Sequence, residues 1–482
     1  MCGFIGVVGV PTVAPVLCLG LSAIQHRGQD AAGLGVVDRG HCRLHKDVGK
    51  VGEVFTSEVL DGLEGSIGVG HVRYPTAGAK NSRVDAQPFM TRRPPLVLAH
   101  NGQVTNMGEL RRHLASRGLR VTSGSDSEAL LLVLGDELLA QRMVGFTEDD
   151  VVQALGRTLQ RVKGSYSAVA MLEMEGEQVL VAFRDAHGFR PAVYGERSDG
   201  AWVAASESVS LDVVDAEVRG HVPAGAVVFL RAGKPPVVRQ VRPAEARHCI
   251  FEDIYFARPD SILETGRVYS SRQRMGEALA HRWRTKGHEA DVVVAVPDTS
   301  RPAAQAMAEA LGLPSREGFI KNRYSGRTFI MPDQASREAA MRLKLNPIDE
   351  IFRGRRVVIV DDSIVRGTTM RRIVQLVRRF EPRALHVAIF SPPVRHPCFY
   401  GIDMPTRAEL VAADIDGELD AVECQLAERF GADSVTFLPV DDLRAVAGDR
   451  LCAACFTGCY PVPVPGDEQG FIVNERRPET HL

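Results

Sequence analysis

The sequence lacks any uncharged apolar run approaching the roughly 20 residues needed to span a membrane, and its start lacks the basic-then-apolar order of a secretory signal. These absences predict a soluble protein of the cytoplasm. The chain also lacks a basic excess, because 58 Lys and Arg are balanced by 60 Asp and Glu, for a net charge of -2. No global signature of nucleic-acid binding is therefore present.

Cysteine is scarce, with nine in 482 residues, which excludes a disulfide scaffold. In a reducing compartment such thiols are expected to be buried, catalytic or bound to metal. Cys18, Cys42 and Cys424 fall in amphipathic or strand-like stretches, which favours a role in the core. Six others need a separate explanation: Cys2, Cys249, Cys398, Cys452, Cys455 and Cys459.

The length predicts two domains, and the two halves of the chain differ in pattern. The first half has short strands separated by polar turns, as in "SAVAMLEMEGEQVLVAF", and a helix at "SEALLLVLGDELLA", which together indicate an α+β domain with antiparallel pairing. The second half alternates buried strand, polar turn and helix, which is typical of an α/β domain with a parallel sheet. No internal repeat is seen.

A Pro- and Arg-rich segment at 231–247 separates the two patterns. We therefore expect one domain over 2–235 and another over 250–465. The Pro-rich, polar end of the chain, 466–482, is predicted to be an irregular tail.

A phosphate site is indicated by "VVIVDDSIVRGTTM", where a buried strand delivers two acids and then a Gly/Thr turn at a helix start. Such a turn offers backbone N–H groups and hydroxyls to a phosphate, while the acids face sugar hydroxyls or a metal. An ordinary strand-to-helix turn is the alternative, but the joint run of acids, Arg366, Gly367, Thr368 and Thr369 favours phosphate. The run is neither a Walker loop nor a dinucleotide fingerprint.

This loop resembles the phosphoribosyl pyrophosphate (PRPP) loop of type I phosphoribosyltransferases. By that resemblance, Asp361 and Asp362 would contact the ribose hydroxyls and Mg²⁺, and residues 363–369 would surround the 5-phosphate. The preceding "VPDTSRP" is similar to the pyrophosphate loop of that fold, which implies Thr299 as a further Mg²⁺ ligand. The implied PRPP-binding residues of the loop are Asp361, Asp362, Ser363, Arg366, Gly367, Thr368 and Thr369.

A cationic segment narrows the resemblance. A solvated surface does not require so many positive charges in one segment, whereas a pyrophosphate leaving group would be stabilised by them. The positively charged residues are Lys321, Arg323, Arg327, Arg337, Arg342 and Lys344. The run "KNRYSGRTFI" resembles the flexible loop of amidophosphoribosyltransferases, which closes over PRPP. This resemblance implies that Lys321, Tyr324 and Arg327 bind PRPP, and that Tyr324 and Ile330 line a passage for ammonia.

Cys2 becomes the N-terminal residue if Met1 is removed, which would put a thiol and an amine on one residue. An α-amine with a pKa of roughly 7.7 to 8.0 can accept the proton of a thiol near roughly 8.5, so no separate catalytic histidine is needed. A cysteine at position 2 could by itself be there by chance. Chance does not account for the three motifs that follow it in order, "HRGQDAAG", "GHVRYPTAG" and "LAHNGQVTN".

These motifs resemble those of class II glutamine amidotransferases, the N-terminal-nucleophile hydrolases with a four-layer αββα fold. The resemblance implies Cys2 as the nucleophile, with Asn101 and the backbone of Gly102 binding the oxyanion. Glutamine itself would be held by Arg73 at its carboxylate, Asp126 at its α-amine, and Arg27. His26, His71 and His100 lie inside strand or turn motifs and are expected to be structural.

Together the two halves resemble an amidophosphoribosyltransferase, which implies the first step of purine synthesis. Cys2 would release ammonia from glutamine, and the ammonia would displace pyrophosphate from C1 of PRPP, giving 5-phosphoribosylamine. A sugar-phosphate aminating synthase would lack the 361–369 loop, and a non-catalytic phosphoribosyltransferase-fold regulator would give no reason for Cys2. Family members also imply a homotetramer or dimer and feedback inhibition by purine nucleotides.

The remaining cysteines are consistent with either of two kinds of metal site. Cys249, Cys398, Cys452 and Cys455 match the ligands of a 4Fe-4S cluster in one branch of the family, with zinc as the alternative. Two features are more similar to the branch without a cluster, namely Met1 directly before Cys2 and Thr299-Ser300 in the pyrophosphate loop. A cluster would be structural, because no step transfers an electron. Cys459 has no assigned role.

Overall fold

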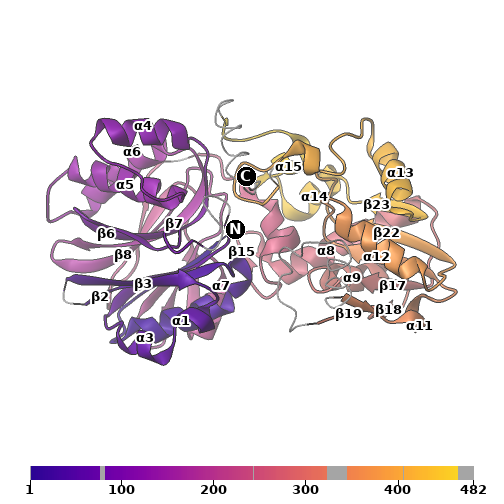
Figure 1. Cartoon of the computed structure of the whole chain (residues 1–482), viewed down its shortest axis with the longest axis horizontal. Helices are drawn as coiled ribbons and strands as arrows, with labels where there is room; N and C mark the ends of the chain where they lie inside the picture. Colours follow the sequence, from indigo (N-terminus) through magenta and orange to yellow (C-terminus); the bar gives the residue numbers. More distant parts are fainter. Residues whose placement is uncertain are drawn as a thin grey trace, which may run out of the picture.

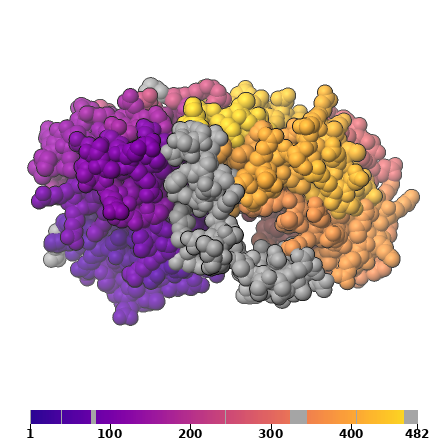
Figure 2. Space-filling view, turned by 45° about the horizontal axis from the view of Figure 1, so that its top comes forward, coloured from indigo at the N-terminus to yellow at the C-terminus, as the bar shows by residue number. Residues whose placement is uncertain are grey.

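The computed structural model of the chain describes residues 2–38, 40–75, 82–242, 244–322, 345–404 and 406–464. It forms two lobes that lie side by side (Figure 1), and Figure 2 shows the same lobes as filled surfaces, indigo to magenta beside orange and yellow. Tyr324, Arg327 and Ile330, expected in the PRPP-covering loop, lie outside the described residues, as does the tail 466–482. Within the described ranges no helix has both the length and the hydropathy to cross a membrane.

Two antiparallel sheets form the centre of the N-terminal lobe. The first has the order β11 (Ala216–His221), β9 (Val193–Arg197), β10 (Trp202–Ala205), β1 (Gly3–Val8), β4 (Ile67–Arg73), β2 (Ala31–Asp38) and β3 (His41–Val48). The second has the order β13 (Val237–Gln240), β12 (Ala226–Leu230), β8 (Glu177–Arg184), β7 (Gly164–Met174), β6 (Pro95–Val104) and β5 (Phe89–Arg92). Phe4, Val97 and Met171 belong to the apolar layer between the sheets.

Helices cover the outer faces of both sheets, which gives four layers (Figure 1). Those over the second sheet are α4 (Met107–Ser116), α5 (Asp126–Leu139) and α6 (Glu148–Arg161). Those on the first sheet's side are η1 (Gln25–Arg27), α1 (Val13–Ala23), α2 (Val51–Val54), α3 (Ser57–Asp61) and α7 (Ser208–Val213). The predicted αββα arrangement is confirmed.

The turn between β7 and β8 shows how the sequence sets the pairing. Glu175 and Gly176 both have positive φ, 51° and 84°, and Met174 pairs with Glu177. A two-residue turn with positive φ at both positions matches the right-handed twist of a hairpin. The Glu-Gly-Glu turn expected between two apolar runs is thus a tight hairpin at the centre of the second sheet.

A parallel sheet organises the C-terminal lobe, as predicted. Its order is β18 (Ser315–Arg316), β17 (Val292–Ala295), β21 (Arg356–Asp361), β22 (Ala384–Ile389) and β23 (Ser434–Phe437). Helices α12 (Thr368–Arg378) and α13 (Leu419–Phe430) share one apolar core with it, and α8 (Val268–Thr285), α9 (Arg301–Leu311) and α14 (Val440–Ala447) share the other.

Smaller elements complete this lobe: η2 (Glu252–Phe256), α11 (Asp349–Phe352), η3 (Arg407–Glu409), α15 (Ala454–Thr457), and the pairs β14 (His248–Cys249) with β24 (Leu451–Cys452), β15 (Ile262–Leu263) with β16 (Gly266–Arg267), and β19 (Phe319–Lys321) with β20 (Leu345–Pro347).

Two expectations need correction. Strand β13 pairs with β12, so the first lobe continues past the expected limit at residue 235, because the Pro- and Arg-rich segment still supplies an edge strand. Cys424 is exposed on α13, and Cys18 and Cys42 are only partly buried. Cys424 is not a core residue, since the helix turns that position away from the sheet it covers.

A buried ion-pair network joins the lobes. Arg27 in η1 pairs with Glu207 of its own lobe and, at 2.7 Å, with Glu252 of the other. Arg190 pairs with Glu252 at 3.3 Å, and all four side chains are almost wholly inaccessible to solvent. Although burial alone would raise it, the charges of Arg27 and His26 hold the pKa of Glu207 far below its usual range.

Acid should therefore weaken this junction. A carboxyl group whose pKa is lower in the folded chain than in the unfolded chain stabilises the folded chain at neutral pH. That stabilisation is lost as the pH falls below about 4.3, the ordinary pKa of a glutamate. We expect Arg27→Met to cost about 3–5 kcal/mol at pH 7, because it leaves buried carboxylates unpaired, and the deficit to shrink near pH 4 as they protonate.

Urea denaturation midpoints between pH 4 and pH 8 measure this effect. Arg117→Met, which removes a solvent-exposed pair with Asp136, is the matched control and should leave the midpoint near that of the unaltered protein. Equal midpoints for the two variants at pH 7 would contradict the prediction.

Candidate active sites

Cys2 lies directly before β1, the central strand of the first sheet, and the chain start falls between the two lobes in Figure 1. Its backbone nitrogen donates a hydrogen bond to Asn101 Oδ1 at 3.2 Å. Its Sγ lies 3.4 Å from the carbonyl oxygen of Tyr74 and 3.5 Å from the Tyr74 nitrogen. The thiol of Cys2 is buried between two strand ends, with its own nitrogen beside it.

The pKa of the Cys2 thiol is raised, chiefly by burial, while the positive amino terminus, a hydrogen bond to the Tyr74 backbone and Arg73 partly oppose that rise. Asp126 raises it further. The sulfur is thus mostly a neutral thiol at pH 7 and needs a base to become a nucleophile. The adjacent nitrogen of Cys2 is suited to that task once it is a free amine.

Asn101 and Gly102 lie on β6 across the sheet interface from Cys2. Asn101 is fully buried, and its Nδ2 donor has no hydrogen-bond partner among the described residues. An unpaired buried donor is costly, so one aimed at a site indicates a missing acceptor such as an oxyanion. Gly102 has φ +157°, and a Cβ there would meet the Ser165 carbonyl oxygen at 1.9 Å, so the close strand approach requires glycine.

Arg73 and Asp126, the expected glutamine ligands, both act on the Cys2 thiol and therefore lie near it. Arg73 ends β4, is buried, and binds Asp30 Oδ2 at 2.7 Å. Asp126 begins α5 and accepts a hydrogen bond from Val104 N at 2.9 Å. Arg27 differs from the expectation, because Glu207 and Glu252 occupy its guanidinium.

The three histidines form hydrogen bonds inside the fold. His71 contacts the His100 carbonyl oxygen at 3.1 Å, and His100 Nδ1 lies 2.7 Å from Ser127 Oγ. Burial lowers the pKa of both rings, which are therefore neutral at pH 7. His26 pairs with Glu207 at the lobe junction.

The predicted phosphate loop lies at the carboxyl edge of the parallel sheet, where ligands of such sheets bind. Strand β21 ends at Asp361, and Gly367, with φ +71°, precedes the first turn of α12. Arg366, Thr368 and Thr369 are exposed there. Arg366 is held at 2.7 Å by Glu409, and Ser363 Oγ donates to Asp362 Oδ1 at 2.6 Å.

Two further predicted residues share this edge. Thr299 lies between β17 and α9, the neighbouring strand and its helix. Lys321, at the end of β19, binds Asp298 of the same loop at 2.6 Å. Tyr324 and Arg327 are outside the described residues.

Asp361 and Asp362 are two adjacent carboxyl groups whose negative charges are unfavourable in this buried position. Burial and their mutual repulsion raise the pKa of Asp361 well above its usual value, and burial raises that of Asp362. Arg272 is the cation that opposes the rise for Asp362. Two crowded carboxylates of this kind suit a hard divalent cation with oxygen ligands.

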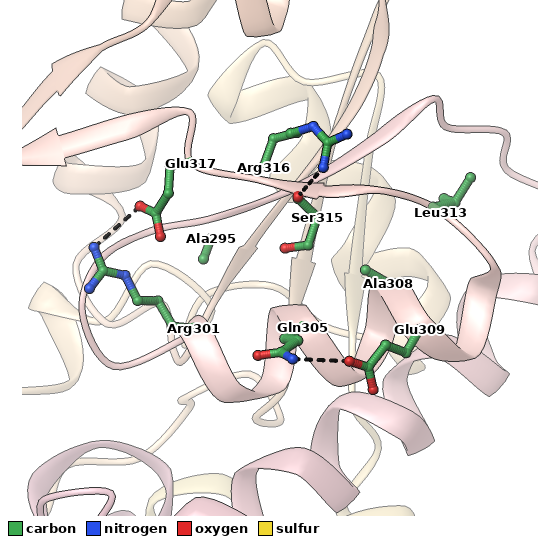
Figure 3. A pocket seen from close by; sticks show the side chains of 9 residues that line it. All are labelled: Ala295, Arg301, Gln305, Ala308, Glu309, Leu313, Ser315, Arg316 and Glu317. Atoms are coloured by element: carbon green, nitrogen blue, oxygen red, sulfur yellow. Dashed lines mark hydrogen bonds and ion pairs between the residues drawn. The ribbon is translucent and has the colours of Figure 1, made fainter.

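A cavity of about 440 Å³ lies beside this edge, between α9 and β18 (Figure 3). Arg301 and Arg316 line it together with Glu309 and Glu317, and Arg301 pairs with Glu317 at 3.2 Å. The cations of this cavity lie among carboxylates, and Arg366 of the loop 363–369 is likewise paired with a carboxylate, that of Glu409. What distinguishes the loop is its run of backbone groups and hydroxyls at the start of a helix.

The four predicted cysteines gather in the C-terminal lobe. Cys249, Cys398, Cys452 and Cys455 line one small cavity of about 10 Å³. Burial raises the pKa of the Cys249 thiol to about 12, with Glu252 and Cys398 adding to the rise and Arg190 opposing it. Burial, followed by the neighbouring cysteines, also raises the pKa values of Cys452 and Cys455. In the parts of the chain that the structure describes, no three His, Cys, Asp or Glu side chains converge closely enough to bind one metal ion.

Sequence reasoning missed several residues of these sites. Tyr74, whose backbone brackets the Cys2 sulfur, belongs to the motif "GHVRYPTAG", and its place directly after Arg73 is the signal that could have identified it. Asp85 and Glu252 are buried carboxylates, and neither spacing nor composition pointed to them. Tertiary folding alone brings them to Arg73 and Arg27.

Comparisons with known proteins match both lobes. A glutamine amidotransferase domain model matches residues 76–213, and a phosphoribosyl transferase domain model matches 266–396. The amidophosphoribosyltransferase of Pseudomonas aeruginosa is 42% identical over 488 residues, covering 98% of this chain and 95% of that protein. That of Archaeoglobus fulgidus is 41% identical over 478 residues, covering 97% and 99%.

Solved structures are similar over the same extent. The glutamine PRPP amidotransferase from B. subtilis, complexed with ADP and GMP, has a TM-score of 0.84 and 37% identity, covering 97% of this chain and 98% of that one. A structure of the allosteric regulatory enzyme of purine biosynthesis has a TM-score of 0.87 and 36% identity, with both chains covered completely.

Proposed function

Because this chain belongs to the amidophosphoribosyltransferases, glutamine-dependent enzymes of purine biosynthesis that act on PRPP, we propose that its two half-reactions are divided between the Cys2 site and the loop 361–369. The observation that carries the proposal is the position of Cys2, whose nitrogen faces Asn101, while the Asn101 Nδ2 donor has no partner within the described part of the chain. A sugar-phosphate aminating enzyme would account for this first site but not for the acidic phosphate loop.

The first half-reaction releases ammonia. With Met1 removed, the α-amine of Cys2 accepts the thiol proton and the thiolate attacks the side-chain carbonyl carbon of glutamine. Asn101 Nδ2 and the backbone of Gly102 stabilise the oxyanion, the amine returns the proton to the leaving nitrogen, and ammonia departs. Water then hydrolyses the thioester to glutamate. Arg73 and Asp126 hold the α-carboxylate and α-amine.

The second half-reaction consumes the ammonia. Residues 363–369 bind the 5-phosphate, and Asp361 and Asp362 face the ribose hydroxyls. Thr299, Asp361 and Asp362 would hold Mg²⁺, which when bound supplies positive charge to the pyrophosphate. Ammonia attacks C1 as the C1–oxygen bond to pyrophosphate breaks, giving 5-phosphoribosylamine. Lys321, and Tyr324 and Arg327 outside the described residues, complete the proposed PRPP site.

Removing the Asn101 amide tests the oxyanion assignment. We expect Asn101→Ala to lower kcat for glutamine about 10²–10³-fold, the usual effect of losing one such donor, with a small change in KM. Ammonia-dependent synthesis should be unchanged. Glutamate release measures the first effect. Asn106→Ala, another buried asparagine on the same lobe, is the control, because its amide bonds to Glu109 and to the Arg161 backbone, away from Cys2. An equal loss of kcat in both variants would argue against the assignment.

We also propose that Cys249, Cys398, Cys452 and Cys455 bind a structural 4Fe-4S cluster. What supports it is that all four thiols line one cavity, and that cysteine thiolates are the usual ligands of such a cluster. Zinc bound by the same four thiolates is the alternative, and metal analysis separates the two.

Iron and sulfide analysis of anaerobically purified protein tests this. We expect about four of each per chain, and broad visible absorbance that is lost in Cys398→Ser together with a lower denaturation midpoint. Cys424→Ser, an exposed thiol elsewhere in the lobe, should keep both. One zinc and no sulfide would show that the cluster assignment is wrong.

Regulation and assembly extend the proposal. The B. subtilis relative was solved with ADP and GMP, which supports feedback inhibition of this chain by purine nucleotides. We also propose a homo-oligomer, a tetramer or dimer, in the cytoplasm. We further propose that the glutaminase domain ends after Gln240 and that the phosphoribosyltransferase domain begins near His248, and the bounds of strands β13 and β14 support these limits.

A further inference from the structure

Asp85 is a buried carboxylate that no step above uses. It lies between β4 and β5, and 4% of the residue is exposed. Its Oδ1 accepts a hydrogen bond from Gly124 N at 2.8 Å, and its Oδ2 lies 3.9 Å from Arg73 Nη2. Burying a charge is costly unless it is paired, so this placement is specified by its partners.

The two partners of Asp85 belong to different parts of the glutamine pocket. Arg73 is the proposed clamp for the α-carboxylate, and Gly124 lies two residues before Asp126, the proposed acceptor for the α-amine. Ser123 and Glu128 tie the same segment to the start of α5, because Ser123 N and Oγ each donate to Glu128 Oε2 at 2.6 Å. A single carboxylate therefore joins the two elements that would contact the head group of the substrate.

The far side of the segment that carries Asp85 is also fixed. Lys46 Nζ donates to the Ala86 carbonyl oxygen at 2.5 Å, and lies 4.1 Å from the centre of the Phe89 ring. Burial lowers the pKa of Lys46 to about 8, with Glu128 and Asp85 opposing the fall. Arg83 Nε donates back to the Lys46 carbonyl oxygen at 3.0 Å. Strand β3 thus holds Asp85 against Arg73 and Gly124.

We propose that Asp85 is a positioning residue that sets the distance between Arg73 and Asp126, and so selects a substrate with an amine and a carboxylate on one carbon. Its two oxygens are turned to Arg73 and Gly124, so it acts through these groups and not by touching glutamine. This inference rests on the proposed glutaminase function. It predicts that Asp85 matters only for reagents that carry the amino-acid head group.

Two reagents that alkylate Cys2 separate positioning from general structure. The diazoketone 6-diazo-5-oxo-L-norleucine carries the amino-acid head group of glutamine, and iodoacetamide carries none. In Asp85→Ala we expect the KM for glutamine and the rate of diazoketone inactivation to worsen about 10–100-fold, the range for losing one hydrogen bond to a charged group. The kcat for glutamine and the rate of iodoacetamide labelling should change less than about threefold.

Asp85→Asn keeps an acceptor for Gly124 N but removes the charge beside Arg73, so its KM should fall between those of the unaltered enzyme and Asp85→Ala. Asp149→Asn, an exposed carboxylate on the same lobe, is the control and should change none of these values. Equal slowing by both reagents, or no slowing by either, would overturn the inference. If the unaltered enzyme is not labelled at Cys2 by the diazoketone, the proposed glutaminase function itself fails.

Discussion

Cys2→Ala should abolish product formation from glutamine, with a loss of at least about 10⁴-fold, and leave ammonia-dependent product formation intact. The reason is spatial: Cys2, Asn101 and Gly102 belong to the first lobe, whereas the loop 361–369 lies on the parallel sheet of the second. Removing one sulfur takes away the proposed nucleophile and leaves every group of the proposed PRPP site in place. Pyrophosphate release with glutamine or with ammonium chloride, each with PRPP and Mg²⁺, measures both rates.

Cys18→Ala is the matched control, because that half-buried thiol lies in α1 away from both sites, and it should keep both activities. Mass spectrometry of the mature chain adds an independent check, since the α-amine of Cys2 is the proposed base. Protein that retains Met1 and is fully active with glutamine would contradict the mechanism, as would loss of the ammonia reaction in Cys2→Ala.

The sequence predicted those parts of the fold and sites that depend on local pattern. A buried strand, two acids and a Gly/Thr turn follow one another within 361–369, and the structure places them at the end of β21 and the start of α12. Likewise, Glu175 and Gly176 form the tight turn that their residue types favour. In both cases neighbours in sequence are neighbours in space, so spacing is informative.

The remainder could not be predicted, because it depends on residues far apart in the chain. Arg27 lies in a motif typical of glutamine-binding enzymes, yet Glu252, 225 residues later, occupies its guanidinium. Asp85 meets Gly124 across 39 residues. A single sequence gives no sign that a given acid will be buried against a given cation, since that follows from how the lobes pack.

Asp361→Asn with Asp362→Asn should abolish product formation from both nitrogen sources, by at least about 10³-fold, in contrast to Cys2→Ala. Asparagine retains the acceptor oxygens that bind Asp362 N and Ser363 Oγ, so the local turn is preserved. The substitutions remove the paired negative charge that would hold Mg²⁺ and orient the ribose hydroxyls. Electrostatic stabilisation of this kind would provide much of the rate enhancement of phosphoribosyl transfer. Labelling of Cys2 by the diazoketone should be unchanged.

The same variant should be more stable than the unaltered protein when Mg²⁺ and PRPP are absent. A carboxyl group whose pKa is raised on folding destabilises the folded chain at pH values above its ordinary pKa of about 3.9, so two neutral amides relieve burial and repulsion. We expect a higher thermal midpoint at pH 7 and a smaller difference near pH 4, where the aspartates are protonated. Asp414→Asn, an exposed pair with Arg429, should shift neither. A lower thermal midpoint, or retained synthesis with ammonia, would show that these two aspartates serve the fold and not PRPP binding. A higher midpoint together with loss of both reactions would mean that the charge is kept, at a cost in stability, because the substrate needs it.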